Sequence, residues 1–93
     1  MKGRIHLEIE ITGYVQELKS VYFELYKQAR LLDIRGFIRF RSPDVLFFEL
    51  EGDQKQVDAY TDWCRTFFHS ENTRFTMREQ GRFMHYSDFF IRE

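Results

Sequence analysis

The segment RIHLEIEI, Arg4 to Ile11, alternates strictly between polar and apolar side chains. Successive side chains of a β-strand point to opposite faces, so this alternation predicts a strand with one buried face and one exposed face. The same period returns in IRGFIRFR and in VLFFELE, and the turn residues of SPD, Ser42 to Asp44, join these two into a predicted hairpin. Strands of this kind need a second layer packed on their apolar side.

Two other segments have the helical period, and we expect helices near Ser20–Asp33 and Asp53–Ser70. NTRFTMRE reads as a fourth strand, and YSDFFIRE as a short terminal strand. This order predicts an α+β fold, a ferredoxin-like βαββαβ sandwich with one antiparallel or mixed sheet of four or five strands and both helices on one face. The side chains that we expect to be buried are Ile5, Leu7, Ile9, Leu25, Ala29, Ile38, Leu46, Phe48, Leu50, Val57, Cys64 and Phe89.

Composition limits the classes of function. A chain of 93 residues, 43% hydrophobic and 18% aromatic, predicts a single domain over residues 1–93. Lys plus Arg number 14 against 15 Asp plus Glu, so no overall charge attracts nucleic acid or an acidic membrane. The N-terminal residues lack the apolar run of a signal peptide and no later run approaches a membrane span, so we expect a cytoplasmic protein. Cys64 is the single cysteine, which excludes an internal disulfide, and we interpret it as a small buried apolar residue.

Several groups of residues, spread over nearly the whole chain, resemble one family in their order and spacing. They are Gly13, Val15 and Gln16; the segment ARLLDIRGFIR, Ala29 to Arg39, with Gly36 and Phe37; Gly52, Val57 and Trp63; and YSDFFIR, Tyr86 to Arg92. Together they are similar to the acylphosphatase family, so the chain resembles a single acylphosphatase-like domain.

The resemblance implies a particular phosphate site. Acylphosphatases hold the phosphate of a carboxylic–phosphoric anhydride with the backbone amides of a glycine-rich loop and an arginine, while an asparagine on the second strand positions the attacking water. In this chain the place of the arginine falls on Tyr22 or, in the other alignment, on Glu24, and the place of the asparagine falls on Phe40. Tyrosine is neutral, glutamate repels phosphate, and phenylalanine holds no water, so the site is predicted to be degenerate.

The loop in GYVQELKSVYFE lacks the family's further glycines. The positions equivalent to the phosphate loop are Gln16, Glu17, Leu18, Lys19 and Ser20. One interpretation is a weak anion site formed by Lys19 and Ser20 at a helix N-terminus. The favoured one is a solvated lysine beside an N-cap serine, because Glu17 opposes an anion.

Other candidate residues have a structural and a functional interpretation. Tyr22 and Phe40 either line an apolar pocket for a different ligand or fill the former site as core, and the core is favoured. His6, His69 and His85 show no ligand spacing to one another, so we expect neither a metal nor a cofactor. Asp58 and Asp62 are one helical turn apart, and we interpret them as solvated surface.

The predicted open face of the sheet carries many charges. We expect Glu8, Glu10, Glu49, Glu51 and Phe47 at its centre, with Arg39 and Arg41 on one edge strand and Arg74 and Arg78 on the other. RNA-binding sheets of this topology present aromatic residues in a basic field, and an acidic centre argues against that role. The charges either pair across strands or meet a protein partner, for which an exposed aromatic such as Phe90 is a second candidate contact.

The sequence therefore predicts an acylphosphatase-like protein without normal catalysis, acting as a binding or interaction module for a protein or a small-molecule ligand. The alternative is an acylphosphatase that hydrolyses acyl phosphates to carboxylate and phosphate with weak or rebuilt activity. That alternative requires a cation from elsewhere in the fold, for which Lys19 and Arg39 are the first candidates.

Overall fold

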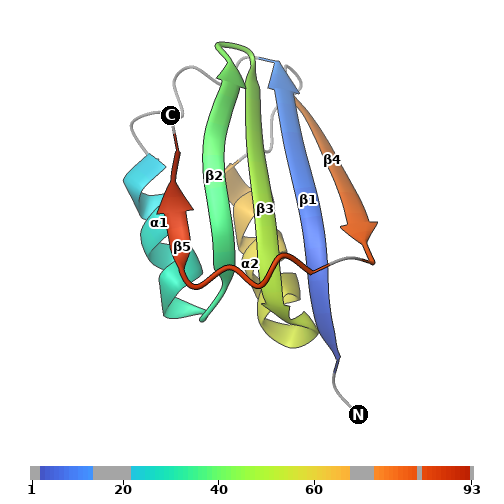
Figure 1. Cartoon of the computed structure of the whole chain (residues 1–93). Helices are drawn as coiled ribbons and strands as arrows, with labels where there is room; N and C mark the ends of the chain where they lie inside the picture. The colour runs from blue at the N-terminus through green and yellow to red at the C-terminus, as the bar shows by residue number, and fades with distance from the viewer. Residues whose placement is uncertain (1–2, 14–21, 68–72, 82, 93) are drawn as a thin grey trace.

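A computed structural model gives the fold and describes residues 3–13, 22–67, 73–81 and 83–92. The elements in chain order are β1 (Arg4–Gly13), α1 (Tyr22–Leu31), β2 (Arg35–Ser42), β3 (Val45–Asp53), α2 (Gln54–Phe67), β4 (Thr73–Gln80) and β5 (Phe89–Ile91). Figure 1 shows them as one sheet with the two helices behind it. The predicted βαββαβ order with a short terminal strand is confirmed.

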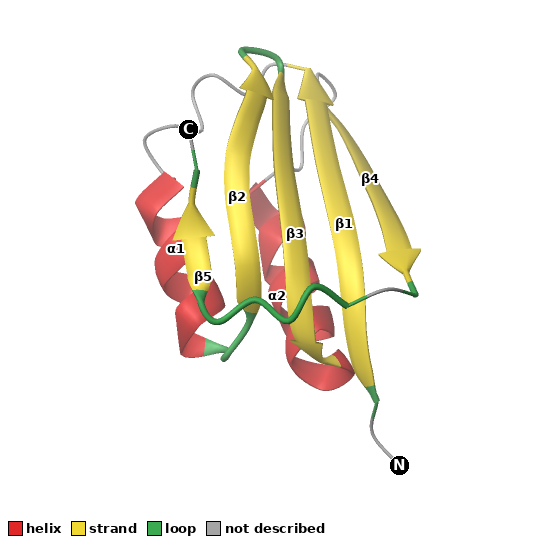
Figure 2. Ribbon diagram, in the orientation of Figure 1, coloured by secondary structure: helices red, strands yellow, loops and turns green. Residues whose placement is uncertain are grey.

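The strands form one mixed sheet in the order β4-β1-β3-β2-β5. All neighbouring pairs are antiparallel except β2 and β5, which are parallel. Both helices cover the same face of this sheet, as Figure 2 shows, so the ferredoxin-like α+β prediction is confirmed. One detail of the prediction was wrong: β2 is not an edge strand, because β5 pairs with its outer side.

The core lies between the sheet and the helices. It combines the inward side chains of β1, β2 and β3 with Leu25 and Ala29 of α1 and Val57, Tyr60 and Cys64 of α2. Every side chain that the sequence predicted to be buried is buried. The Tyr60 hydroxyl donates a hydrogen bond of 2.8 Å to the carbonyl of Leu25, which satisfies a buried polar group and ties the helices together.

The helices are shorter than predicted where the structure describes their ends. Asp33 has a φ of 57°, in the left-handed region that ends helices, and the amide of Ile34 donates to the carbonyl of Ala29 at 2.9 Å. Asp53 belongs to β3, where it pairs with Arg4. The other predicted ends, Ser20 and Ser70, lie outside the described residues.

Gly36 is a position where only glycine fits. Its φ is 136°, and a Cβ atom placed there would lie 1.8 Å from the carbonyl oxygen of Glu49. A side chain at this position would therefore push β2 away from β3.

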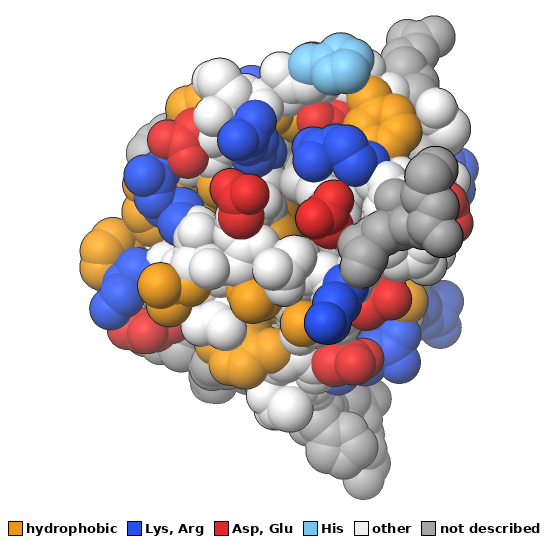
Figure 3. Space-filling view, turned by 90° about the horizontal axis from the view of Figure 1, so that it is seen from below, with side chains coloured by type: hydrophobic (Ala, Val, Ile, Leu, Met, Phe, Trp, Pro, Cys, Tyr) orange, Lys and Arg blue, Asp and Glu red, His pale blue; other side chains and the backbone are white. Residues whose placement is uncertain are grey.

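Charged side chains of both signs mix on the surface. Figure 3 shows basic and acidic groups interleaved at the lower end of the molecule, without a large area of one sign. No helix in the described part of the chain is long and apolar enough to cross a membrane.

Candidate functional site

The described chain resumes after the predicted phosphate loop at Tyr22. The loop positions Gln16, Glu17, Leu18, Lys19 and Ser20 lie outside the described residues, as does His69. The other predicted site positions are described: Tyr22, its alternative Glu24, which is exposed on α1, and Phe40.

The structure brings Tyr22 and Phe40 together. Tyr22 is the first residue of α1, Phe40 lies near the end of β2 on its helix-facing side, and their ring centroids are 5.3 Å apart. The Tyr22 hydroxyl lies within hydrogen-bond distance of two backbone carbonyls, those of Ile38 at 3.2 Å and Arg92 at 3.3 Å. Two neutral aromatic side chains thus join the start of α1 to β2 and to the end of β5. We call this pair the aromatic plug.

The segment of residues 83–88 runs across the open face of the sheet before it enters β5. Figure 1 shows this crossing segment in front of the lower ends of β1, β3 and β2. Its backbone amides at Met84 and Tyr86 both donate to the carboxylate of Glu51, the second at 3.1 Å. A buried carboxylate on β3 therefore holds the segment against the sheet.

Three more groups complete this contact. The Tyr86 hydroxyl donates to Oε1 of Glu49 at 2.7 Å, and Nε2 of His6 lies 3.1 Å from the same oxygen. The other ring nitrogen of His6 lies 3.6 Å from Oε2 of Glu51. Burial raises the pKa of the Tyr86 hydroxyl, and its hydrogen bond to Glu49 raises it further, so Tyr86 stays neutral and keeps its proton.

The prediction that these glutamates lie exposed at the centre of an open face was therefore wrong in part. They are on the predicted face, but Glu51 is only 1% exposed and His6 only 3%, because the crossing segment covers them. Phe47 is also buried, since the guanidinium of Arg41 lies 3.6 Å above its ring. Strand alternation correctly placed these residues on the open face of the sheet. It gave no indication that residues 83–88 cross this face and cover part of it.

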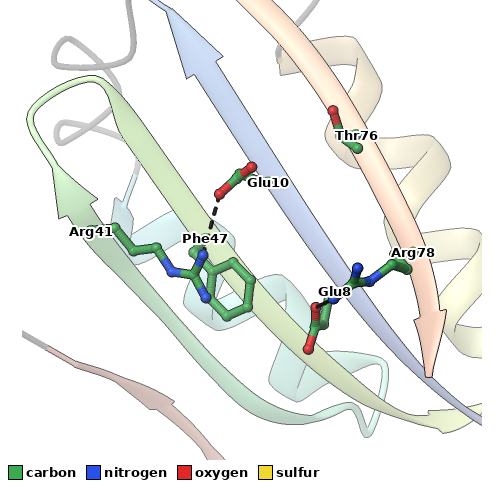
Figure 4. Close-up of a pocket in the computed structure, with 6 residues that line it drawn as sticks. All are labelled: Glu8, Glu10, Arg41, Phe47, Thr76 and Arg78. Carbon is green, nitrogen blue, oxygen red and sulfur yellow. Dashed lines mark hydrogen bonds and ion pairs between the residues drawn. The ribbon is translucent and has the colours of Figure 1, made fainter. Parts of the chain in front are cut away.

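The rest of the face stays open and contains a shallow hollow of about 200 Å³. Its lining residues are Glu8, Glu10, Arg41, Phe47, Thr76 and Arg78, drawn in Figure 4. Arg41 reaches from β2 across Phe47 to Glu10, with Nη1 3.3 Å from Oε2, and Arg78 reaches from β4 to Glu8 at 3.5 Å. The predicted pairing of charges across strands is present in these two ion pairs.

Arg39 differs from those two arginines. It is half-buried beside Phe47, its partner in the β2–β3 register. Its Nε atom is buried and has no hydrogen-bond partner among the described residues. Within the described ranges no carboxylate lies at ion-pair distance from Arg39. Sequence reasoning identified Arg39 as an edge-strand charge and missed that it lacks such an acceptor, because this depends on where every nearby carboxylate points.

Other candidates have simpler explanations. Burial raises the pKa of the Cys64 thiol to about 12, so this residue is a protonated core side chain and not a reactive thiol. Asp58 and Asp62 are exposed on α2, as predicted. Among the described residues no group of three or more His, Cys, Asp or Glu side chains is placed to hold a metal ion. Phe90 is 39% exposed on β5.

Comparison with known proteins agrees with the fold. The acylphosphatase family model matches residues 7–91. The acylphosphatase from Bacillus subtilis superposes with a TM-score of 0.82 at 13% identity, over 96% of this chain and 99% of that chain. The acylphosphatase from Coxiella burnetii gives 0.78 at 20% identity, over 96% and 93% of the two chains. Full-length HypF in its phosphate- and nucleotide-bound form gives 0.77 at 20% identity, over all of this chain and 12% of that one. No curated protein sequence matches the chain.

Proposed function

Because the chain belongs to the acylphosphatase family, we propose that it is a member without normal acyl-phosphate hydrolysis and that it acts as a binding or interaction module. The observation that carries this proposal is the aromatic plug. The resemblance places the family's arginine at Tyr22 or Glu24 and its asparagine at Phe40, and the ring centroids of Tyr22 and Phe40 lie 5.3 Å apart.

The chemistry of the plug opposes phosphate binding. Hydrolysis of an acyl phosphate needs positive charge at the phosphate oxygens and a polar group that positions the water. The Tyr22 hydroxyl is neutral and lies against backbone carbonyls of the protein itself, and Phe40 has no polar atom in its side chain. Removing one such group from an active site typically lowers the rate on the order of a hundred- to a thousandfold, so removing both should bring turnover near the uncatalysed rate.

Arg39 does not replace the missing arginine. It precedes Phe40 on β2, so its side chain is on the opposite face of the sheet, where it lies beside Phe47. Phe40 instead packs against the core on the helix side. A cation on the far side of a strand does not reach a phosphate held at the start of α1.

The test is the hydrolysis of benzoyl phosphate, followed by the loss of its absorbance. We expect the purified protein to match the buffer rate, with the Bacillus subtilis acylphosphatase as the active reference. Saturable turnover that inorganic phosphate inhibits would overturn the proposal and favour the alternative, an acylphosphatase with weak or rebuilt activity.

A single substitution sharpens this test. Tyr22→Arg restores a guanidinium at one family position, yet we expect no rescue of hydrolysis, because Phe40 still leaves the water without a partner. The same assay checks this expectation, with the circular dichroism spectrum of the variant as the control for folding. Recovery of activity in Tyr22→Arg would mean that water positioning does not depend on residue 40.

A further inference from the structure

Three arginines lie close together on the open face of the sheet, at its β2–β5 side. Arg39 and Arg41 are two residues apart on β2. The β2–β3 register shifts between Phe40 and Ser42, and the contacts of Arg41 with Phe47 and Glu10 place it on the open face with Arg39. Arg92 follows β5, where its amide donates to the carbonyl of Ile38 at 2.9 Å, and this places it beside Arg39. We call these three residues the arginine patch.

Two buried aromatic rings form the floor of the patch. The guanidinium of Arg41 lies 3.6 Å above the ring of Phe47, and that of Arg92 lies 4.4 Å above the ring of Phe37. The two rings contact each other with centroids 5.9 Å apart. A guanidinium stacked on a ring keeps the N–H groups at its edge available, and these match the geometry of a carboxylate.

The acceptors near the patch are already engaged. Glu10 pairs with Arg41 at 3.3 Å, and Glu49 receives the Tyr86 hydroxyl at 2.7 Å and contacts His6 at 3.1 Å. Arg39 therefore has no carboxylate acceptor in the described part of the chain, and its Nε is buried there without a hydrogen bond. Arg39 as a whole is only half-buried, so a carboxylate from outside the protein reaches the part of its side chain that stays exposed and compensates its positive charge.

We propose that the arginine patch binds carboxylate side chains of an acidic, extended segment of a protein partner. This inference rests on the proposed binding function and names the chemistry of its partner. Acidic residues at every second position of an extended segment lie on one side of it, roughly 7 Å apart, so two of them can face Arg39 and Arg41, which are also two residues apart. An arginine–carboxylate pair is planar and bidentate, and the pair formed at Arg39 supplies the carboxylate that this residue lacks.

The neighbouring hollow limits the advantage of a doubly charged anion over a carboxylate. Glu8 and Glu10 line the hollow, which shares Arg41 and Phe47 with the patch (Figure 4). Their negative charges partly cancel the field of the arginines, and this reduces the extra attraction that a phosphate dianion has over a carboxylate. The same hollow has room for an uncharged side chain of the segment beside the acidic one.

The test uses a fluorescent peptide with glutamate at every second position and serine between, and a control peptide with glutamine in place of glutamate. Fluorescence anisotropy at low ionic strength measures their binding to the full chain. We expect saturable binding of the glutamate peptide alone, weakening as salt is added. Equal binding of the glutamine peptide, or no binding of either, would overturn the proposal.

Variants locate the binding. Arg39→Met should weaken binding about tenfold or more, since it deletes a charge-assisted hydrogen bond. Arg39→Lys should weaken binding less, because lysine keeps the positive charge but lacks the planar guanidinium that binds a carboxylate with two hydrogen bonds. Arg74→Met is the matched control: it removes the same charge from the same face on the far strand β4, and binding should change by at most about twofold. Equal losses in Arg39→Met and Arg74→Met would refute a specific site. Urea unfolding of Arg39→Met checks that the fold is intact.

Inorganic phosphate separates the two anion chemistries. Displacement of the peptide by phosphate at concentrations below those of acetate would overturn the carboxylate assignment. The benzoyl phosphate assay stands apart from all of these measurements. An active enzyme that still binds the peptide would refute the proposed function and leave the patch standing, whereas an inactive protein that binds no acidic peptide would refute the patch alone.

Discussion

Phe40 and Arg39 are neighbours on β2 and point to opposite sides of the sheet. The two sides differ in whether their polar groups have hydrogen-bond and ion-pair partners. On the helix side, Phe40 packs against Tyr22, whose hydroxyl lies against protein carbonyls. On the open side, Arg39 has a buried Nε with no acceptor among the described residues. The packed neutral rings on the helix side provide no positive charge for an anion. The guanidinium of Arg39 on the open side provides that charge and has no carboxylate paired with it among the described residues. For this reason we propose the open face as the binding surface.

The same contrast divides the open face itself. Under the crossing segment, Glu51 is 1% exposed and satisfies the amides of Met84 and Tyr86. Beyond the segment, the side chain of Glu8 is 25% exposed and pairs with an arginine that is 74% exposed. Burial and hydrogen bonding make the first carboxylate structural, and exposure leaves the second one exchangeable.

Glu51→Ala should have the largest effect on stability. The change leaves two partly buried backbone amides without their acceptor, and we expect the free energy of unfolding to fall by about 3 kcal/mol. Urea unfolding followed by circular dichroism measures the loss. Glu8→Ala, which breaks only an exposed ion pair, should cost less than about 1 kcal/mol. Similar losses in both variants would remove the distinction between the two halves of the face.

Phe40→Ala tests the aromatic plug. Phe40 is half-buried against the core and against Tyr22, so its removal should lower the free energy of unfolding by about 2 kcal/mol. Phe23→Ala is the control on the same side of the molecule, because Phe23 is 58% exposed, and its effect should stay within about 0.5 kcal/mol. A stable Phe40→Ala variant would show that the plug is not part of the packing.

Alkaline pH tests how well the helix side excludes water. Burial raises the pKa of Cys64 from its ordinary value of 9.0 to about 12. Above pH 9 the thiol loses its proton in the unfolded state and keeps it in the folded state. Deprotonation therefore stabilises the unfolded state, and the free energy of unfolding falls as pH rises. At pH 10 this loss should be about 1.4 kcal/mol in the wild type.

The control for that experiment is Cys64→Ala, compared at pH 7 and pH 10 by urea unfolding. The variant starts from its own stability at pH 7, and its decline between the two pH values should be smaller than that of the wild type by the contribution of the thiol. Identical declines would mean that Cys64 titrates as an exposed thiol.

Arg39→Met should have the smallest effect on stability. Arg39 makes no ion pair among the described residues, and methionine fills similar space without a buried unsatisfied donor. The free energy of unfolding should stay within about 0.5 kcal/mol of the wild type or rise slightly. A loss above about 1 kcal/mol would show that Arg39 has a stabilising partner, and the comparison between the two sides of β2 would fail.

The sequence predicted the fold because its patterns are local and redundant. Alternation from Arg4 to Ile11 and helical spacing of residues such as Leu25 and Ala29 each identify a buried face, and these faces agree with one another. Gly36 was identified through the family resemblance. The reason for a glycine there needed the structure, because the carbonyl oxygen of Glu49 lies 1.8 Å from the point where a Cβ atom would sit.

The candidate site was predictable only in part. The family resemblance assigned the arginine position to Tyr22 or Glu24 and the asparagine position to Phe40, and the structure places the rings of Tyr22 and Phe40 together. The burial of His6 and Glu51 did not follow, because it depends on a segment that crosses three strands without any period of its own. Local patterns do not encode such a crossing, nor do they show that no described carboxylate reaches Arg39.

The central claim is that anion binding has no place at the aromatic plug and belongs to the open face. One amide NMR titration tests both halves of it on the same ¹⁵N-labelled protein, first with inorganic phosphate and then with the glutamate peptide. We expect no saturable phosphate shifts in residues 13–24 and saturable peptide shifts around Arg39, Arg41 and Arg92. Saturable phosphate shifts in residues 13–24, with no peptide response in β2 and β5, would contradict it.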